Sequence, residues 1–375
     1  MPESKNRLLE VFGLFLKLGC IAFGGPAAHI SMMEEEVVTK RKWMSRQYFL
    51  DMVGATNLVP GPNSTQMTMH CGHVRAGWKG LWVAGIAFIG PAVFFTLILA
   101  IIYGTYGEVP EIAPFFFGIK PAVIGLIVNA TFKLGKKAFK NLELIILGVA
   151  ITVMSLYGLD EFLLIIGSGV IGMLLMGFRE PVRFRSVSFP LLIAMKPLVA
   201  VITNKSIFLT FLKIAMVLFG SGYVLIAYLD AELVEKLGWL TKDQLLDAIA
   251  MGQFTPGPVL TTATFVGYQM NGLSGALWAS LGMFLPSFFL VGLLVKLIPY
   301  LRKSVLLSKF LDAVNAGAVG IMIAVTLKLG YELAFDWRAA VLMALSILIT
   351  FFMKKISPLW IILGGGILGY LINLF

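Results

Sequence analysis

Long apolar runs with few charges dominate the chain and predict membrane-spanning helices. Each run approaches the ~20 residues that an α-helix needs to cross about 30 Å of hydrocarbon. Two further apolar stretches, residues 8–33 and 207–228, predict one additional helix each. The pattern therefore predicts an all-α integral membrane protein, whose clearest runs are residues 80–103, 115–132, 142–157, 162–178, 277–297 and 310–327.

The sequence repeats itself with a shift of 196 residues. Lys17 returns as Lys213, Trp43 as Trp239, and Pro60-Gly61-Pro62 as Pro256-Gly257-Pro258. One residue is then lost, and the remaining matches follow a shift of 195, such as Thr131 with Thr326. Chance does not align such residues through ungapped sequence. We therefore predict two homologous domains, an N-terminal repeat of residues 1–186 and a C-terminal repeat of residues 207–375, joined by a linker of residues 187–206.

The loop charges indicate that the two repeats have opposite orientations in the membrane. Cytoplasmic loops of membrane proteins carry an excess of Lys and Arg. In the first repeat, Arg75 and Lys79 precede the helix of residues 80–103, and acidic residues follow it. In the second repeat the order is reversed, since acidic residues precede the equivalent helix and basic residues follow it. This is the pattern of an inverted-topology repeat, in which transporters bind their substrate near the midplane.

The number of crossings depends on two stretches that Pro-Gly-Pro interrupts, residues 45–76 and 241–272. We expect each stretch to form a re-entrant helical hairpin that crosses nothing. Each repeat then has five crossings, about ten in all, and both chain ends lie outside. If each stretch were one broken spanning helix, a repeat would have six crossings, and the inversion would require residues 188–203 to span as well.

Composition and motifs narrow the function further. With 58% hydrophobic and 13% charged residues, the chain cannot form a soluble fold, and basic loops explain its net charge of +10 without nucleic acid. We find no cleavable signal peptide, no disulfide framework and no nucleotide-binding or hydrolase motif. His70-Cys71-Gly72-His73 lacks the further ligands of a metal cluster. We therefore expect neither an enzyme nor a bound metal or cofactor.

The most informative local sequence is Pro60-Gly61-Pro62 with the polar residues that follow it. Proline suits the first turn of a helix, so the segment ends one helix and starts another. The first N–H groups of a helix lack intrahelical partners and lie at its positive dipole end, which makes a ready anion site. A plain kink is the alternative. The candidate substrate-binding residues are Gly61, Asn63, Ser64, Thr65 and Gln66, with Gly257, Thr261 and Thr262 in the second repeat.

A second break follows each first helix. Phe23-Gly24-Gly25-Pro26 in the first repeat corresponds to a stretch that includes Gly220 and Ser221 in the second. Glycine pairs allow helices to pack closely, which is one explanation of this motif. The alternative is another helix start at Pro26 that faces the same cavity, and we include Gly24, Gly25, Pro26, Gly220 and Ser221 among the candidate substrate-binding residues.

Lys17 and Lys213 lie well inside the predicted first helices, and a lysine in hydrocarbon costs about 2.5–3.5 kcal/mol. Their recurrence favours a pair of ligands for a small divalent anion, while snorkelling to the interface is the alternative. Asp51 and Asp247 are equivalent acids in the interrupted stretches. They are either helix-start or salt-bridge partners or a proton-coupling pair.

With these motifs the chain resembles the long-chain members of the chromate ion transporter family. The resemblance rests on Phe23-Gly24-Gly25-Pro26 and Pro60-Gly61-Pro62-Asn63-Ser64-Thr65-Gln66, and it covers nearly the whole chain. It implies a multi-pass transporter of the plasma (inner) membrane that exports chromate, with sulfate as a related substrate. The alternative is a transporter or channel for another small anion or solute on the same fold. The sequence leaves open whether the protein is a monomer or a homodimer.

Overall fold

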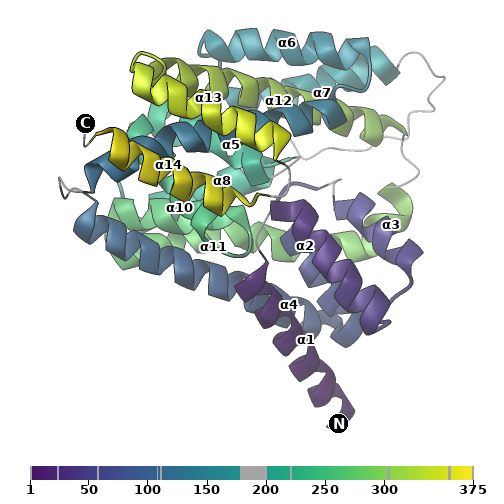
Figure 1. The fold of residues 1–375 in the computed structure, drawn as a ribbon. Coiled ribbons are helices and arrows are strands. Elements are labelled where there is room, and N and C mark those ends of the chain that lie inside the picture. Colours follow the sequence, from purple (N-terminus) through teal and green to yellow (C-terminus); the bar gives the residue numbers. More distant parts are fainter. Residues whose placement is uncertain are drawn as a thin grey trace.

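The computed structural model describes a protein made of helices and the short turns between them (Figure 1). The description covers residues 2–22, 25–56, 59–107, 109, 112–177, 201–219, 222–301, 305–353 and 356–373. In the N-terminal part of the chain the helices are α1 (Pro2–Ile21), α2 (Gly25–Met33), η1 (Glu34–Lys40), α3 (Arg46–Thr56), α4 (Asn63–Tyr106), α5 (Ala113–Ala138), α6 (Leu142–Leu156) and α7 (Glu161–Gly177).

The C-terminal part has the same order of α- and π-helices, with two additional 3₁₀-helices, η2 and η4. These are α8 (Asn204–Val217), η2 (Gly222–Val224), α9 (Leu225–Leu229), η3 (Asp230–Lys236), α10 (Lys242–Phe254), η4 (Val259–Thr261), α11 (Thr262–Leu301), α12 (Val305–Leu333), α13 (Trp337–Phe352) and α14 (Pro358–Ile372). Among the described residues, four stretches are long and apolar enough to cross a membrane: Asn63–Tyr106, Ala113–Ala138, Val259–Leu294 and Ser308–Leu333. Shorter apolar helices accompany them, so the all-α membrane class is confirmed.

The first apolar stretch of each repeat is not one spanning helix. Lys17 on α1 lies 4.0 Å from Glu36 on η1, measured between Nζ and Oε1. A continuous helix would separate these residues by roughly 28 Å, at about 1.5 Å of rise per residue. The chain therefore turns back after α1, so the prediction of a single crossing over residues 8–33 is wrong. The reason is Gly25, which begins the new helix α2 with a φ angle of +79°, and Pro26, which follows it in the first turn.

The second repeat turns back in the same way. Lys213 on α8 lies 2.7 Å from Glu232 on η3, again 19 positions along the chain. The hydroxyl of Tyr228 donates to the carbonyl oxygen of Val217 at 2.6 Å. Residues 207–228 are therefore a pair of antiparallel helices, and the count of about ten crossings, which included this stretch as one crossing, is too high in this part.

The Pro-Gly-Pro sequences interrupt the helices as expected. Helix α3 ends at Thr56 and α4 begins at Asn63, while α10 ends at Phe254 and η4 begins at Val259. The glycines have positive φ angles, +117° at Gly61 and +88° at Gly257, in the left-handed region that favours glycine. The break thus follows from the residue types.

A second turn lies inside α4 and inside α11. The backbone leaves the helical conformation at Ala76 and Gly77 in α4, and at Asn271 and Gly272 in α11. Across the first turn, a Cβ added at Gly72 would overlap the carbonyl oxygen of Gly80, so the two segments of α4 pack backbone to backbone. The same close contact joins the segments of α11 at their glycines, Gly267 and Gly275.

The two repeats exchange backbone hydrogen bonds at their breaks. The N–H of Gly61 donates to the carbonyl oxygen of Leu218 at 2.7 Å. The N–H of Gly257 donates to the carbonyl oxygen of Ala22 at 2.8 Å. The two donors are equivalent under the shift of 196, and so are the two acceptors. Each repeat therefore accepts a hydrogen bond from the Pro-Gly-Pro break of the other.

Long helices of the two repeats pack against each other. The ring of Trp78, near the start of the second segment of α4, packs against Gly292 in the second segment of α11, and Gly85, further along α4, lies beside Phe288 of α11. The second segments of the two helices are therefore antiparallel. Helix α5 packs on α13 and α14, and α12 packs on α6 and α7, as Figure 1 shows. The hydroxyls of Thr131 and Thr326, which are equivalent residues, lie 3.5 Å apart.

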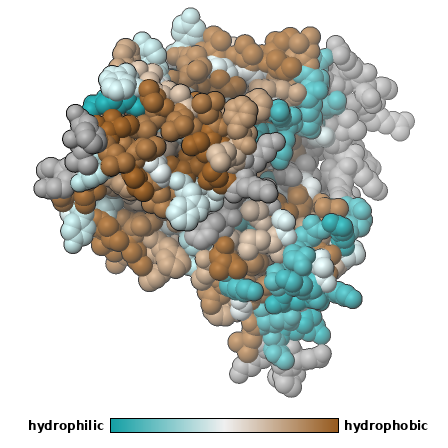
Figure 2. Space-filling view, viewed as in Figure 1, coloured by the Kyte–Doolittle hydropathy of each residue, from teal (hydrophilic) through white to brown (hydrophobic). Residues whose placement is uncertain are grey.

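The surface matches a membrane protein on the face that Figure 2 shows. Hydrophobic residues cover most of the body formed by α4–α7 and α10–α14, and hydrophilic residues gather over α1, α2 and α3. Many large apolar side chains point outward, including Phe94 at 59% exposure and Phe289 at 64%. Such exposure is costly in water and favourable in lipid.

The close approach inside α4 generates a stability prediction. Gly72→Ala should lower the free energy of unfolding by about 1–3 kcal/mol, because the new Cβ has no space against Gly80. Gly90→Ala on the same helix is the control, since an added Cβ there meets no atom within 4 Å. Thermal unfolding of the purified protein in detergent measures both. Equal melting temperatures for the two variants would contradict the hairpin packing.

Candidate functional site

Buried polar side chains gather at the start of α4. Ser64, Thr65 and Gln66 are at most 1% exposed and follow Pro62, which stands at the N-cap position. The side-chain amide of Gln66 donates to the carbonyl oxygen of Pro60 at 2.6 Å, which fixes the Pro-Gly-Pro turn against the helix that follows it. The predicted helix start with its polar residues is therefore present in the protein interior.

His29 connects this helix start to the first break. Its Nε2 lies 2.9 Å from the carbonyl oxygen of Ala22, and its Nδ1 lies 3.2 Å from the hydroxyl oxygen of Ser64. Because a carbonyl oxygen only accepts, Nε2 carries a proton, and in the neutral ring Nδ1 accepts from Ser64. The carbonyl of Ala22 thus accepts from both His29 and Gly257, which ties the first break to both repeats.

Two polar atoms at the start of α4 have no hydrogen-bond partner among the described residues. They are the hydroxyl of Thr65 and the amide oxygen of Gln66, both fully buried. An unpaired buried polar group costs about 1–3 kcal/mol, so such groups are rare unless a ligand or water pairs with them. The hydroxyl can donate to an anion that reaches the helix start.

The equivalent hydroxyls of the second repeat are already used. Thr261 donates to the carbonyl oxygen of Pro258 at 3.0 Å, and Thr262 donates to that of Val259 at 2.8 Å. Both side chains are buried, at 0% and 2% exposure. The two helix starts therefore differ, because only the first leaves a hydroxyl donor without a partner among these residues.

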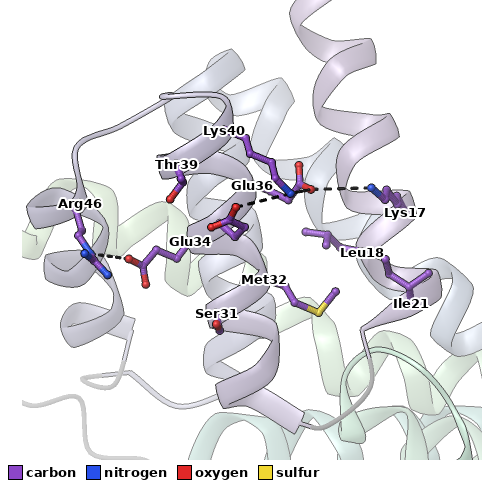
Figure 3. Close-up of a pocket in the computed structure, with 11 residues that line it drawn as sticks. Lys17, Leu18, Ile21, Ser31, Met32, Glu34, Glu36, Thr39, Lys40 and Arg46 are labelled. Atoms are coloured by element: carbon purple, nitrogen blue, oxygen red, sulfur yellow. Dashed lines mark hydrogen bonds and ion pairs between the residues drawn. The ribbon is translucent and has the colours of Figure 1, made fainter.

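Lys17 lines a pocket of about 520 Å³ (Figure 3). Its side chain is 60% exposed, and its polar contact among the described residues is Glu36 at 4.0 Å. The other lining residues come from α1, α2, η1 and α3, namely Leu18, Ile21, Ser31, Met32, Glu34, Glu35, Glu36, Thr39, Lys40 and Arg46. Asn63 to Gln66 are not part of this lining, so the structure does not bring Lys17 together with the start of α4.

The ion pairs of this pocket centre on Glu36 rather than on Lys17. Glu36 pairs with Lys40 at 3.2 Å and also with Arg41. Burial alone would raise the pKa of Glu36, but these two cations outweigh it and hold the pKa below its usual value. Glu36 is therefore ionised and already has two closer partners than Lys17. Lys17 has the longest of these contacts to Glu36, at 4.0 Å, and its ammonium is accessible to a soluble anion.

Lys213 is more tightly held than Lys17. Its ammonium lies 2.7 Å from Glu232, whose side chain is 7% exposed, and 3.9 Å from the ring centre of Phe162. A charged pair of this kind, closed over by an aromatic face, is costly to separate. Lys213 is thus committed to Glu232 in this conformation.

The remaining candidate residues have separate locations. Gly25 and Pro26 begin α2, beside Tyr223 of the other repeat, while Gly24, Gly220 and Ser221 lie outside the described residues. Asp51 accepts from the side-chain amide of Gln47 at 2.9 Å, one turn away on α3. Asp247 is buried on α10 and accepts from the hydroxyl of Tyr103 at 2.7 Å. The two equivalent acids therefore have different partners.

The sequence reasoning missed three residues that organise this region. Glu36 and Glu232 are equivalent under the shift of 196, as are Lys40 and Lys236, so the repeat alignment carried the signal for both acids. Glu36 and Glu232 lie beside lysines of α1 and α8 because the chain turns back after each of these helices, and the sequence alone did not indicate that turn. His29 has leucine at its equivalent position, Leu225, and no pattern in the sequence pointed to it.

Comparisons with known proteins assign the chain to a family. The family model described as chromate transporter matches residues 9–173 and residues 205–370. A probable chromate transport protein of Synechococcus elongatus is 30% identical over 344 residues, which cover 88% of this chain and 86% of that protein. A chromate transport protein of Cupriavidus metallidurans is 29% identical over 98% of this chain and 93% of its own length. The uncharacterised transporter YwrA of Bacillus subtilis is 26% identical, over 44% of this chain and 94% of its own length.

No solved structure matches the chain. The family model covers most of the sequence in two regions, the relatives from Synechococcus elongatus and Cupriavidus metallidurans match 88% and 98% of the chain, and the family is one of transporters rather than enzymes. The apolar helices of the structure agree with a multi-pass protein of the plasma membrane. The chain therefore belongs to the chromate transporter family.

Proposed function

We propose that this protein exports a small inorganic oxyanion across the plasma membrane, with chromate as the first substrate and sulfate as a related one. The observation that carries the proposal is the match to proteins named chromate transport protein along nearly the whole chain. Chromate and sulfate are both tetrahedral dianions of similar size, so one set of hydrogen-bond donors suits either.

The contacts at the start of α4 support a dianion site there. A dianion that leaves water needs several donors, because burying it unpaired costs far more than binding returns. The first N–H groups of α4 and the unpaired hydroxyl of Thr65 are donors that need no reorganisation. Lys17, in the pocket beside α2, serves in this proposal as the cation that attracts the anion before it reaches the interior.

The membrane potential is a sufficient driving force for export in this proposal. Moving one charge through 100 mV is worth about 2.3 kcal/mol, so a dianion that leaves a negative interior gains about 4.6 kcal/mol. At about 1.36 kcal/mol per factor of ten, this supports a gradient of roughly a few thousand-fold. Exchange for another ion on the outside would serve the same purpose. Asp51 and Asp247 remain candidates for coupling, of which only Asp247 is buried.

We also propose that residues 1–186 and 207–375 are inverted repeats joined by residues 187–206. The equivalent hydrogen bonds of Gly61 and Gly257 and the antiparallel course of the second segments of α4 and α11 support this arrangement. The half-length relative supports a repeat as a structural unit. In this arrangement the stretches 45–76 and 241–272 are re-entrant hairpins that meet the turned-back first helices near the midplane. The alternative in which residues 188–203 span concerns a stretch that lies mostly outside the described residues.

Flux through the purified protein tests the substrate. Protein in sealed liposomes should release radiolabelled chromate. A potential that is negative inside the liposomes should accelerate this release by tenfold or more per roughly 60 mV, because a dianion gains about 2.8 kcal/mol over that potential. Liposomes with unlabelled sulfate outside measure competition. Flux of neither oxyanion, with another small anion transported instead, would contradict the proposed substrate.

Cysteine labelling tests the orientation of the repeats. Cysteines placed at Lys137 and Ala334, in a variant with Cys20 and Cys71 replaced, are exposed and lie in equivalent connections of the two repeats. A membrane-impermeant thiol reagent should reach the first from the cytoplasm and the second from the exterior. Labelling of both from one side would remove the inverted arrangement but not the family or the transport activity.

Removing one hydroxyl tests the anion site. Thr65→Val keeps the shape of the side chain, and since hydrogen bonds to charged groups are worth about 1.5–3 kcal/mol, the apparent affinity for chromate should fall about 10- to 100-fold. The folded protein should be at least as stable as before, because the hydroxyl has no hydrogen-bond partner among the described residues. Thr68→Val is the control, as its hydroxyl donates to the carbonyl oxygen of Ser64 at 3.0 Å. Equal affinities in both variants and the unaltered protein would place the anion elsewhere.

A further inference from the structure

One buried carboxyl group in the structure has no partner. Asp230 is the first residue of η3, its side chain is 0% exposed, and neither of its oxygens has a hydrogen-bond partner among the described residues. An isolated ionised carboxylate in such surroundings is so costly that the group normally neutralises itself. Asp230 therefore needs either a neighbouring positive charge or a bound proton.

The two lysines whose charges act most on Asp230 are already paired with other acids. Lys242 on α10 pairs with Glu332 on α12, and Lys328 on α12 pairs with Glu235 on η3 at 2.7 Å. These four residues exert the main electrostatic influences on Asp230, and their charges cancel in pairs. Two further lysines on these elements are also paired with acids, Lys213 with Glu232 and Lys236 with Asp160. Glu161, beside Asp160, is another acid and supplies no positive charge. No positive charge is left over for Asp230 in this group.

The first repeat shows the same pair in a different state. The shift of 196 relates Glu34 to Asp230 and Arg46 to Lys242. Arg46 lies 2.7 Å from Glu34, as Figure 3 shows, and both side chains reach solvent. In the second repeat the equivalent base, Lys242, has turned to Glu332 instead. Of the two equivalent acids, Asp230 is therefore the one without a pairing base in this group, and it is the one that is fully buried.

We propose that Asp230 is a proton-binding site, and that its proton determines whether Lys242 pairs with Glu332 or with Asp230. With the proton bound, the carboxylic acid is neutral and the observed pairing of Lys242 with Glu332 is stable. When the proton leaves to solvent, the carboxylate draws Lys242 away from Glu332, as Glu34 holds Arg46 in the first repeat. The step transfers one proton and changes no covalent bond other than O–H.

A proton fits this position better than a metal ion. Calcium takes six to eight oxygen ligands and magnesium six, and the described residues contain no cluster of three or more acidic, histidine or cysteine side chains that suits a metal. Burial, and next Glu235, raise the pKa of Asp230 to about 6, while Lys328 and Lys242 act against this increase. Asp230 lies outside the four long apolar spans, and in this proposal its proton reaches water by way of the charged side chains of Glu235, Lys328 and Glu332.

The pairing of Lys242 matters for transport because it connects α10 to α12. Helix α10 leads into the second Pro-Gly-Pro break, and α12 packs on α6 and α7 of the other repeat. Release of this connection by deprotonation would loosen the second break from that bundle. This consequence rests on the proposed transport function, whereas the proton site itself does not.

Infrared spectroscopy of Asp230→Asn tests the site directly. The unaltered protein should show the C=O band of a buried carboxylic acid that disappears as the pH rises through about 6, and Asp230→Asn should lack this component. Glu34→Gln, at the paired and solvent-exposed equivalent, should retain it. Lys242→Gln should shift the disappearance to higher pH, because the carboxylate then has no cation to recruit. The same titrating band in Asp230→Asn would overturn the proposal.

Thermal unfolding gives a second readout that does not depend on transport. A pKa that is raised in the folded state makes the protein lose stability as the pH rises from the unfolded value of about 3.9 to about 6, with a constant deficit above that. Asp230→Asn should therefore melt higher than the unaltered protein near pH 8 and at the same temperature near pH 4. A lower melting temperature near pH 8 would overturn the proposal.

Flux measurements separate this inference from the proposed function. If the protein transports chromate, the rate should change with pH around about 6 in the unaltered protein and should be constant in Asp230→Asn. If it transports no oxyanion but the infrared band titrates as expected, the proton site stands and the substrate proposal fails. A pH dependence of transport that persists in Asp230→Asn would overturn the role of this proton.

Discussion

Helices that break inside an apolar interior release backbone groups that must find partners within the protein, and this requirement organises the chain. Lipid offers no hydrogen bonds, so a broken helix survives only where protein or enclosed water surrounds the break. Here the N–H of Gly61 reaches Leu218, and that of Gly257 reaches Ala22. The acceptors are carbonyl groups that the ends of α1 and α8 leave free. Each break is therefore satisfied by the other repeat, and neither repeat is complete alone.

The two repeats share a backbone plan but not the same chemistry at its centre. Lys17 is exposed beside an acid that has other partners, whereas Lys213 is enclosed between Glu232 and Phe162. The hydroxyl of Thr65 has no partner among the described residues, whereas that of Thr261 donates to the carbonyl oxygen of Pro258. Arg46 pairs with Glu34, whereas Lys242 pairs with Glu332 and not with Asp230, the equivalent of Glu34. Residues that are equivalent in the sequence thus have different partners in the two parts of the chain.

Residue types that restrict the backbone allowed much of the local structure to be predicted. Proline and glycine fixed the interruptions between Thr56 and Asn63 and between Phe254 and Val259, and the alternative of a helix start at Pro26 was correct within one residue. What the sequence did not reveal was the direction of the chain after a break. An apolar stretch of spanning length is equally compatible with one long helix and with two short antiparallel ones, because hydropathy measures composition and not direction. The partners of Lys17, Lys213 and Ser64 depend on that direction, so Glu36, Glu232 and His29 escaped the prediction.

The exchange of hydrogen bonds between the repeats has a consequence for how the protein is made. The acceptor for Gly61 is Leu218, and since 218 − 61 = 157, the ribosome adds this acceptor 157 residues after Gly61. At about 5–20 residues per second, the first break waits roughly ten to thirty seconds for its partner. During that interval the open turn has to be covered by water or by the insertion machinery. We therefore expect the N-terminal helices to reach their final depth in the membrane only after α8 is synthesised, when Leu218 can accept the hydrogen bond of Gly61.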